Sequence, residues 1–334
     1  MINGGYFNTI QMKSLINILR LIAVLALPIS TFSQSLHYPE RPVRIIVPFG
    51  VGGLADITFR IYSEKLSALS GKQFVVENIP GSGGFTAAIN LLKAKPDGHT
   101  LMVMTNGTAI SKSLYKSMPY DPSTDLIPIS FAGDFDLIIL ARGDSKISNF
   151  SQLMSTAKKT DKGLNIGTIN PGSTQNLAAE MFKSVTHLNA QIIPYKSTPE
   201  ALNSLLAGDV DIVFETYATS KSLVDSGKLL ALASTGSQRS EYLPKVPTVS
   251  ELGVGSYEVV GWNALAAATG TPVETVQAIN KLVNSVADMS EVKQKLNALG
   301  SKAHAGSSQE IQKRFSEDLT KWANVIKQSS IEIQ

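Results

Sequence analysis

The sequence contains no cysteine among its 334 residues. This absence excludes disulfide bonds, thiol nucleophiles, cysteine-ligated zinc and covalent haem attachment. Hydrophobic residues nevertheless make up 43% of the chain, which is enough for a large core and favours two domains over one. The fold must therefore be held by its core alone.

Charge is also scarce. Charged residues make up 17% of the chain, and no run of basic residues is longer than the pairs Lys158-Lys159 and Lys313-Arg314. Proteins that coat nucleic acid carry clusters of Lys and Arg, and disordered chains bury too little apolar surface to fold. The composition argues against both classes, so we expect no nucleic-acid partner.

Signatures of catalysis are missing as well. No histidine has a second histidine or a carboxylate pair at helical spacing, which a metal-binding helix would require; the four are His37, His99, His187 and His304. There is no G-x-S-x-G motif, and no serine has a recognisable base partner. We expect no enzyme, no cofactor and no metal; a secreted α/β hydrolase or a transferase is the enzymatic alternative.

No acidic residue precedes Glu40. Within this region, two basic residues precede the apolar run LIAVLALPI and a group of small polar residues, which is typical of a secretory signal peptide. The run is shorter than the roughly 20 apolar residues of a membrane span. Thr31 and Ser33 fit the −3 and −1 positions of a cut before Gln34. We predict a signal peptide over 1–33 and a periplasmic mature chain; a retained membrane anchor is the alternative.

What the sequence does contain is a strand, a glycine-rich turn and a helix start. The apolar run Val43–Val47 predicts a buried strand, Gly52 and Gly53 follow it, and the spacing of apolar residues predicts a helix over 56–70. Glycines expose backbone N–H groups, and a helix N-terminus is positive. The loop is therefore a candidate anion site.

The pattern of a strand, a loop and a helix start occurs again further along the chain. A predicted strand over 74–77 precedes the loop Gly81–Gly84 and a helix over 85–93, and a strand over 100–104 precedes Asn106. Alternating strands and helices predict a parallel sheet, whose ligands bind beyond the carboxyl ends of the strands. All three loops are expected at that edge.

A second α/β unit of similar design is predicted further on. Its expected strands are 137–140, 164–167, 192–195, 212–214 and 229–233. Its expected helices are 148–159, with Ser148 as its cap, 176–183, 199–206 and 217–224. The chain then yields a strand over 261–267 and helices over 272–289, 290–298 and 307–328, which should pack on the first unit. We predict domain 1 from 34–135 with 258–334, and domain 2 from 136–257.

Nucleotide binding is the main alternative for the first loop. The segment GVGGLA half-satisfies a dinucleotide fingerprint, and no Lys-Ser/Thr follows as a phosphate loop requires. A secreted chain is also a poor place for a dinucleotide.

Ten short segments, in the family's order, resemble the Bug family, the extracytoplasmic solute-binding proteins of tripartite tricarboxylate transporters. In chain order they are 38–44, 47–49 with Gly52, Gly53 and Asp56, 76–78 with 80–84, 96–98, 119–122, 194–196, 208–211, 226–229, 246–248 and 261–262. Each segment alone is common, but together they span the whole mature chain.

The resemblance implies a periplasmic binding protein-like (Venus flytrap) fold, in which two α/β domains, each with a mostly parallel sheet, close over a small carboxylate. It implies delivery to transporter membrane subunits; a ligand-sensing receptor without transport is the alternative. A monomer is expected. The residues implied to hold the ligand are Phe49, Gly52, Gly53, Asp56, Gly81, Ser82, Gly84, Gly172, Ser173 and Thr174.

Three further residues complete the candidate site: Asn106 after the third strand, Asn176, and Glu215 at the end of a strand. Asn176 replaces a His that is frequent in the family, and Glu215 replaces a frequent Asp; with Phe85, which replaces a frequent Asn, they are expected to select the acid. A carboxylate at 215 would repel a dianion, which favours a ligand with an amine or ring nitrogen. Structural roles are the alternative: a first-turn acid for Asp56, helix caps for the hydroxyls, and core for Phe49 and Trp262.

Overall fold

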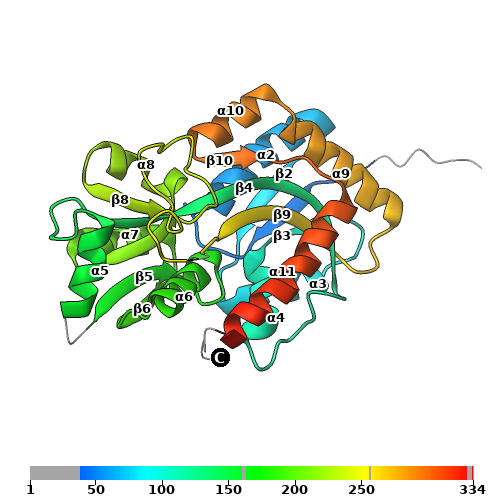
Figure 1. The fold of residues 1–334 in the computed structure, drawn as a ribbon. Helices are drawn as coiled ribbons and strands as arrows, with labels where there is room; N and C mark the ends of the chain where they lie inside the picture. Colours follow the sequence, from blue (N-terminus) through cyan, green and yellow to red (C-terminus); the bar gives the residue numbers. More distant parts are fainter. Residues whose placement is uncertain (1–37, 160–162, 256, 329–332, 334) are drawn as a thin grey trace, which may run out of the picture. The chain divides into compact units, whose positions relative to one another are not determined.

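The computed structural model describes residues 38–159, 163–255, 257–328 and 333, so the predicted signal peptide lies outside the described residues. Residues Tyr38–Gln334 form one compact unit. Its strands join in a ten-stranded sheet with the order β2-β1-β3-β9-β4-β7-β5-β6, while β8 and β10 pair with β4 (Figure 1). The predicted α/β class is confirmed.

The first half of the sheet begins with alternating strands and helices. They are β1 (Val43–Val47), α2 (Leu54–Ser70), β2 (Phe74–Asn78), the short helix η1 (Ser82–Gly84), α3 (Phe85–Leu92), β3 (Thr100–Thr105) and α4 (Asn106–Leu114). Strands β2, β1 and β3 pair in parallel, as predicted. Helix α2 ends at Gly71, whose φ of 69° is a conformation that glycine adopts without strain.

The second half of the sheet repeats the pattern. Its elements are α5 (Phe150–Lys159), β5 (Leu164–Ile169), α6 (Thr174–Thr186), β6 (Ala190–Tyr195), α7 (Thr198–Ala207), β7 (Ile212–Thr216), α8 (Tyr217–Asp225) and β8 (Leu229–Ser234). Strands β6, β5 and β7 pair in parallel. The carboxyl ends of these strands carry the N-termini of α6, α7 and α8.

Two strands cross between the halves. Strand β4 (Leu126–Arg142) is 17 residues long and pairs antiparallel with β9 (Val260–Ala268) in the first half and with β7 and β8 in the second. The chain then returns to the first half through α9 (Val273–Ala287), α10 (Ser290–Ala298), β10 (Ser301–Ala303) and α11 (Ser308–Gln328). The predicted return of the C-terminal helices is therefore observed.

Helices cover both faces of the first half. Ile45 and Val47 of β1 are buried in one cluster with residues of α2, α9 and α10, whereas Ile46 belongs to a cluster with α3, α4 and α11 (Figure 1). Successive strand residues point to opposite faces, so the apolar residues 45–47 need cover on both sides.

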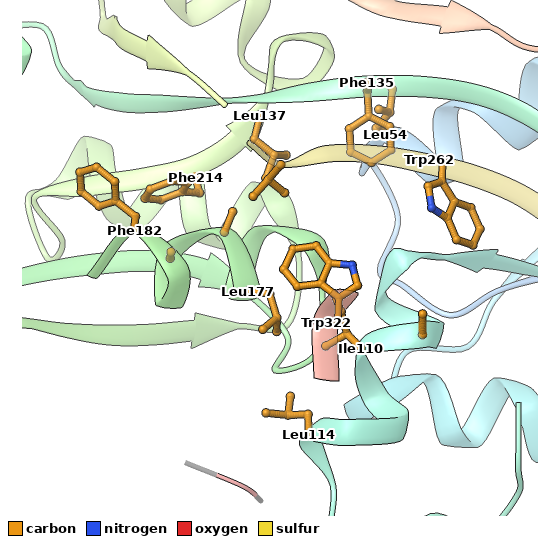
Figure 2. Packing of buried hydrophobic residues seen from close by; sticks show 14 of the residues in the cluster. Leu54, Ile110, Leu114, Phe135, Leu137, Leu177, Phe182, Phe214, Trp262 and Trp322 are labelled. Carbon is orange, nitrogen blue, oxygen red and sulfur yellow. The ribbon is translucent and has the colours of Figure 1, made fainter. Parts of the chain in front are cut away.

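One hydrophobic cluster continues from the first half into the second. Figure 2 shows part of it, with Phe182 and Phe214 beside the second-half strands and Trp262 on β9. Trp322 of α11 is buried in the same cluster as Leu177 of α6. Among the described residues, no helix has both the length and the apolar character needed to cross a membrane.

Several local expectations were wrong. Residues 106–108, predicted as a loop, form the first turn of α4, because Thr105 and Thr108 make a reciprocal capping box. The N–H of Gln152 donates to Asn149 Oδ1 at 2.9 Å, so Asn149 rather than Ser148 caps α5. Strand β10 was not predicted, since three residues give no periodicity. The division into two domains stays a prediction.

Candidate functional site

A cavity lies where strand ends of both halves meet. The space between its walls is about 490 Å³ when its open mouth is included. Its lining residues are Phe49, Gly50, Gly53, Leu54, Ala55, Thr105, Phe135, Ile169, Asn170, Thr174, Gln175, Lys196, Ser197, Thr198, Thr216 and Asn263. We call it the main cavity.

The N-termini of five helices reach this cavity. Gly53, Thr105, Ser197 and Thr216 precede α2, α4, α7 and α8, and Thr174 is the first residue of α6. Each helix N-terminus carries unpaired N–H groups and a partial positive charge. Their convergence creates an electrostatic preference for an anion.

The first turn of α2 has no side-chain cap. Ser197 and Thr105 accept hydrogen bonds from backbone N–H groups of their own helices, but Gly53 has no side chain to do so. Gly53, Leu54 and Ala55 all line the main cavity. Their backbone can therefore donate to a bound acid group.

The side-chain charge at the main cavity is positive, like that of the helix N-termini. Of the described residues that line the main cavity, Lys196 alone is charged; it is exposed, and its ammonium forms no ion pair with the described part of the chain. No Asp or Glu is among the lining residues. An anion in the cavity would therefore meet no carboxylate among the lining side chains.

Asp56 holds the first loop from within. Its Oδ2 accepts from the N–H of Gly52 at 3.0 Å, and its Oδ1 accepts from Arg60 Nε at 2.9 Å. Burial raises the pKa of Asp56, but hydrogen bonds from Arg60, Gly52 and Asn78 outweigh it and lower the pKa below its ordinary value. Asp56 is therefore ionised and stabilises the loop. The N–H of Gly52 already donates to Asp56 and so is not free for a ligand.

We predict that Asp56→Asn lowers the free energy of unfolding by about 2 kcal/mol at pH 7, because a buried carboxylate with two charge-assisted partners is lost. Since the pKa of Asp56 is lowered in the folded state, its contribution is present above pH 3.8 and is lost as the pH falls through the folded value. Urea denaturation from pH 3 to 7 checks both. An equal cost at every pH would contradict an ionised Asp56.

Glu215 lies behind the cavity wall. Its side chain is fully buried and is not among the lining groups. Gln175 Nε2 donates to Oε1 at 3.1 Å, the Thr216 N–H to Oε1 at 2.8 Å, and Thr198 Oγ1 to Oε2 at 2.8 Å. Burial raises the pKa of Glu215 despite these bonds. Glu215 therefore anchors three residues that do line the cavity.

The second loop opens on a smaller neighbouring cavity. Gly81, Gly84, Gly172 and Ser173 line this space of about 300 Å³, and Phe49 lines both cavities. Ser173 also accepts from the N–H of Asn176 as the cap of α6. The side chain of Ser82 lies outside what the structure describes.

Two predicted ligand contacts point into the protein. Asn106 Nδ2 donates to the carbonyl of Val260, and its Oδ1 accepts from Thr174 Oγ1 at 3.2 Å and from the Trp262 N–H at 3.1 Å. Asn176 Oδ1 accepts from the N–H of Gly172 at 3.3 Å. Neither asparagine lines either cavity. Asn106 instead ties the first half to α6.

Several lining residues were not among the predicted site residues. Lys196, Ser197 and Thr198 follow β6, so the rule for strand ends could have found them. Gly50 lies against this segment: a Cβ on Gly50 would be 3.0 Å from that of Ser197. Phe135 lies inside a strand and leaves no comparable signal in the sequence.

The chain is similar in sequence and structure to known periplasmic binding proteins. BugT of Bordetella pertussis is 29% identical, over 95% of this chain and 100% of its own length. The periplasmic binding protein BugD is 31% identical with a TM-score of 0.84, covering 89% of this chain and 100% of BugD. The structure of R. palustris Rpa4515 with adipate is 31% identical with a TM-score of 0.85, covering 88% and 99%.

MatC from Rhodopseudomonas palustris, solved with bound malate, is 27% identical with a TM-score of 0.82, covering 86% of this chain and 100% of MatC. These likenesses confirm the periplasmic binding protein fold, and binding proteins rather than enzymes are the rule among them. The model of the tripartite tricarboxylate transporter family receptor matches residues 58–331. The chain therefore belongs to the tripartite tricarboxylate transporter receptor family.

Proposed function

We propose that this chain captures a small carboxylate in the main cavity and presents it to the membrane subunits of a tripartite transporter. The observation that carries the proposal is the meeting of five helix N-termini and Lys196 in a cavity with no lining carboxylate. An acid group at Gly53 would take the place of the missing side-chain cap of α2. The relatives solved with adipate and malate support an organic acid as ligand.

Binding would draw the two halves together about β4 and β9, with domain 1 and domain 2 divided as the sequence predicts. Two close contacts between the halves support this: Gly50 lies against Ser197, and a Cβ on Gly107 would come within 2.6 Å of the Gly172 carbonyl oxygen. A ligand that bridges the halves shifts the population toward the closed form.

Gly107→Ala should weaken ligand affinity about 10-fold while α4 itself becomes no less stable. The methyl group would push Gly172 away, but alanine favours a helix over glycine by about 1 kcal/mol. Calorimetric titration and thermal melts measure the two effects separately. Ser113→Ala, in the same helix, is the matched control and should bind like the wild type; equal affinity in both variants would exclude this contact from closure.

The central experiment is a thermal-shift screen of residues 34–334 against adipate, malate, succinate and citrate. A ligand at a hundredfold its dissociation constant adds about 2.7 kcal/mol of stability, which is roughly 4 °C in melting temperature for a chain of this size. The neutral diamide of adipate should give no shift. If no acid shifts the melting point and titration calorimetry detects none, carboxylate capture is wrong.

The remaining parts of the proposal concern processing and assembly. We expect export, removal of residues 1–33 and a monomeric mature protein. Intact mass measured on periplasmic extract would identify the cut before Gln34, and light scattering would measure the oligomeric state. Uptake of labelled ligand with and without the membrane subunits distinguishes transport from sensing alone.

A further inference from the structure

Asn263 is the one described residue of the main cavity with a fully buried polar atom that has no partner. Its side chain is 1% exposed, and Nδ2 has no hydrogen-bond partner in the described part of the chain. An unpaired buried donor costs about 1–3 kcal/mol, so such a group in a native fold needs an explanation.

Neither residue paired with Asn263 on the neighbouring strands is a hydrogen-bond partner of its Nδ2. On β9 it is paired with Thr105 of β3 on one side and with Gly133 of β4 on the other, and side chains of directly paired residues share a face. Gly133 has no side chain, and Thr105 Oγ1 accepts from the N–H of Gly107 at 3.0 Å. The neighbouring Trp262 donates from Nε1 to Asp318 at 2.6 Å.

The cavity therefore offers polar groups of two kinds. Lys196 is exposed and stands beside the helix N-termini, whereas Asn263 is buried within the sheet at the register of the last residue of β3. Apolar side chains, among them Phe135 and Leu54, complete the lining. A ligand that satisfies all of these needs an acid group, a short carbon chain and a second oxygen acceptor.

We propose that Asn263 is a specificity-determining residue: its Nδ2 donates to the second carboxylate of a short dicarboxylate whose first carboxylate lies at the helix N-termini. This inference rests on the proposed function and adds the ligand class. A monocarboxylate of equal length leaves the Asn263 donor unpaired, so it binds more weakly. Selection for the diacid thus comes from a neutral amide, which avoids the desolvation cost of a buried cation.

The test compares adipate with hexanoate and succinate with butyrate by titration calorimetry. The wild type should bind each diacid at least 10-fold more tightly than its monoacid. Asn263→Leu, which has nearly the same shape, should lose at least 10-fold in diacid affinity, leave the monoacid unchanged, and melt no lower without ligand because it removes an unpaired amide. Asn263→Ala serves as a second variant if the leucine side chain does not fit.

A further variant, Asn263→Asp, should reverse the ligand preference. A carboxylate at this place should repel adipate and accept from an ammonium, so the variant should prefer 6-aminohexanoate to adipate. If the wild type binds diacids but the Leu and Ala variants keep the full diacid preference, this inference is wrong and the proposed function stands. If the wild type binds none of these acids, the proposed function itself fails, and this inference with it.

Discussion

Gly53→Asp should abolish carboxylate binding and leave the protein at least as stable as before. Gly53 precedes α2 with φ −81° and ψ 164°, a conformation open to every residue. A Cβ there would be 3.5 Å from Thr198 Oγ1 and 3.9 Å from the Gly50 carbonyl oxygen, which are ordinary contacts. Aspartate is also among the best N-cap residues, although its advantage over glycine there is only about a few tenths of a kcal/mol.

The same carboxylate would stand where we propose that the ligand's acid group binds. Two like charges about 4 Å apart repel by about 4 kcal/mol at an effective dielectric constant of 20, which corresponds to about 1,000-fold in affinity. Titration calorimetry with adipate or malate, together with thermal melts, measures both effects. Gly53→Asn is the matched control, since it caps the helix without the charge.

A clear ordering is expected among the three proteins. The asparagine variant should retain most of the affinity, while the aspartate variant should lose it at an equal or higher melting temperature. If both variants bind equally well, the acid group does not lie at the N-terminus of α2. If the aspartate variant is unstable, Gly53 has a conformational role that its dihedral angles do not show.

Much of this fold could be predicted because local signals agree with tertiary packing. Strand β1 is apolar on both faces, and Gly71 and Gly208 mark the ends of α2 and α7 with positive φ. Helix α4 could not be predicted from NGTAISKSL, since glycine, serine and threonine are weak helix formers. It is stabilised by its capping box and by burial against α11, which only the folded chain provides.

The long strand β4 was predicted only in its second part, Leu137–Leu140. Its first part contains Pro128 and Gly133, which interrupt the pattern of a strand, and the register with β9 shifts at two places there. Pairing with β9 on one side and β10 on the other overrides these local signals. Irregularities of this kind are properties of the sheet rather than of one segment.

For the site, sequence indicates which residues stand at strand ends but not where their side chains point. Gly53 and Thr174 line the main cavity, whereas Asn106 and Asn176 are used within the protein. The reason is that buried polar side chains satisfy each other first. Asn263 illustrates the converse, because an unpaired donor becomes visible only when all its neighbours are known.

Glu215→Ala should lower the free energy of unfolding by about 3 kcal/mol, the largest stability loss that we expect at this site. The change leaves three buried donors, from Gln175, Thr198 and Thr216, without their acceptor and opens a small cavity. Ligand affinity should fall as well, because Gln175 and Thr198 line the main cavity. Urea denaturation and calorimetry measure the two losses.

Glu215→Gln is the control that isolates charge. An amide can accept from Gln175 and the Thr216 N–H and donate to Thr198, so it reproduces the bonds of a protonated carboxyl group. Because burial raises the pKa of Glu215 above its ordinary value of 4.5, the unfolded chain ionises first as the pH rises. The contribution of Glu215 to the free energy of unfolding is therefore fully present below pH 4.5. Above this pH it declines by up to about 1.4 kcal/mol per pH unit, until the pH reaches the pKa of Glu215 in the folded protein.

The glutamine variant lacks this decline, so its stability relative to the wild type should increase as the pH is raised above 4.5. Denaturation curves of both proteins from pH 4 to 8 provide the measurement. A relative gain for the wild type would mean that Glu215 is ionised in the folded protein and stabilised by its three donors. In that case a negative charge would lie directly behind the cavity wall, and selection for a ligand with an amine, as the sequence first suggested, would become the better account of this residue.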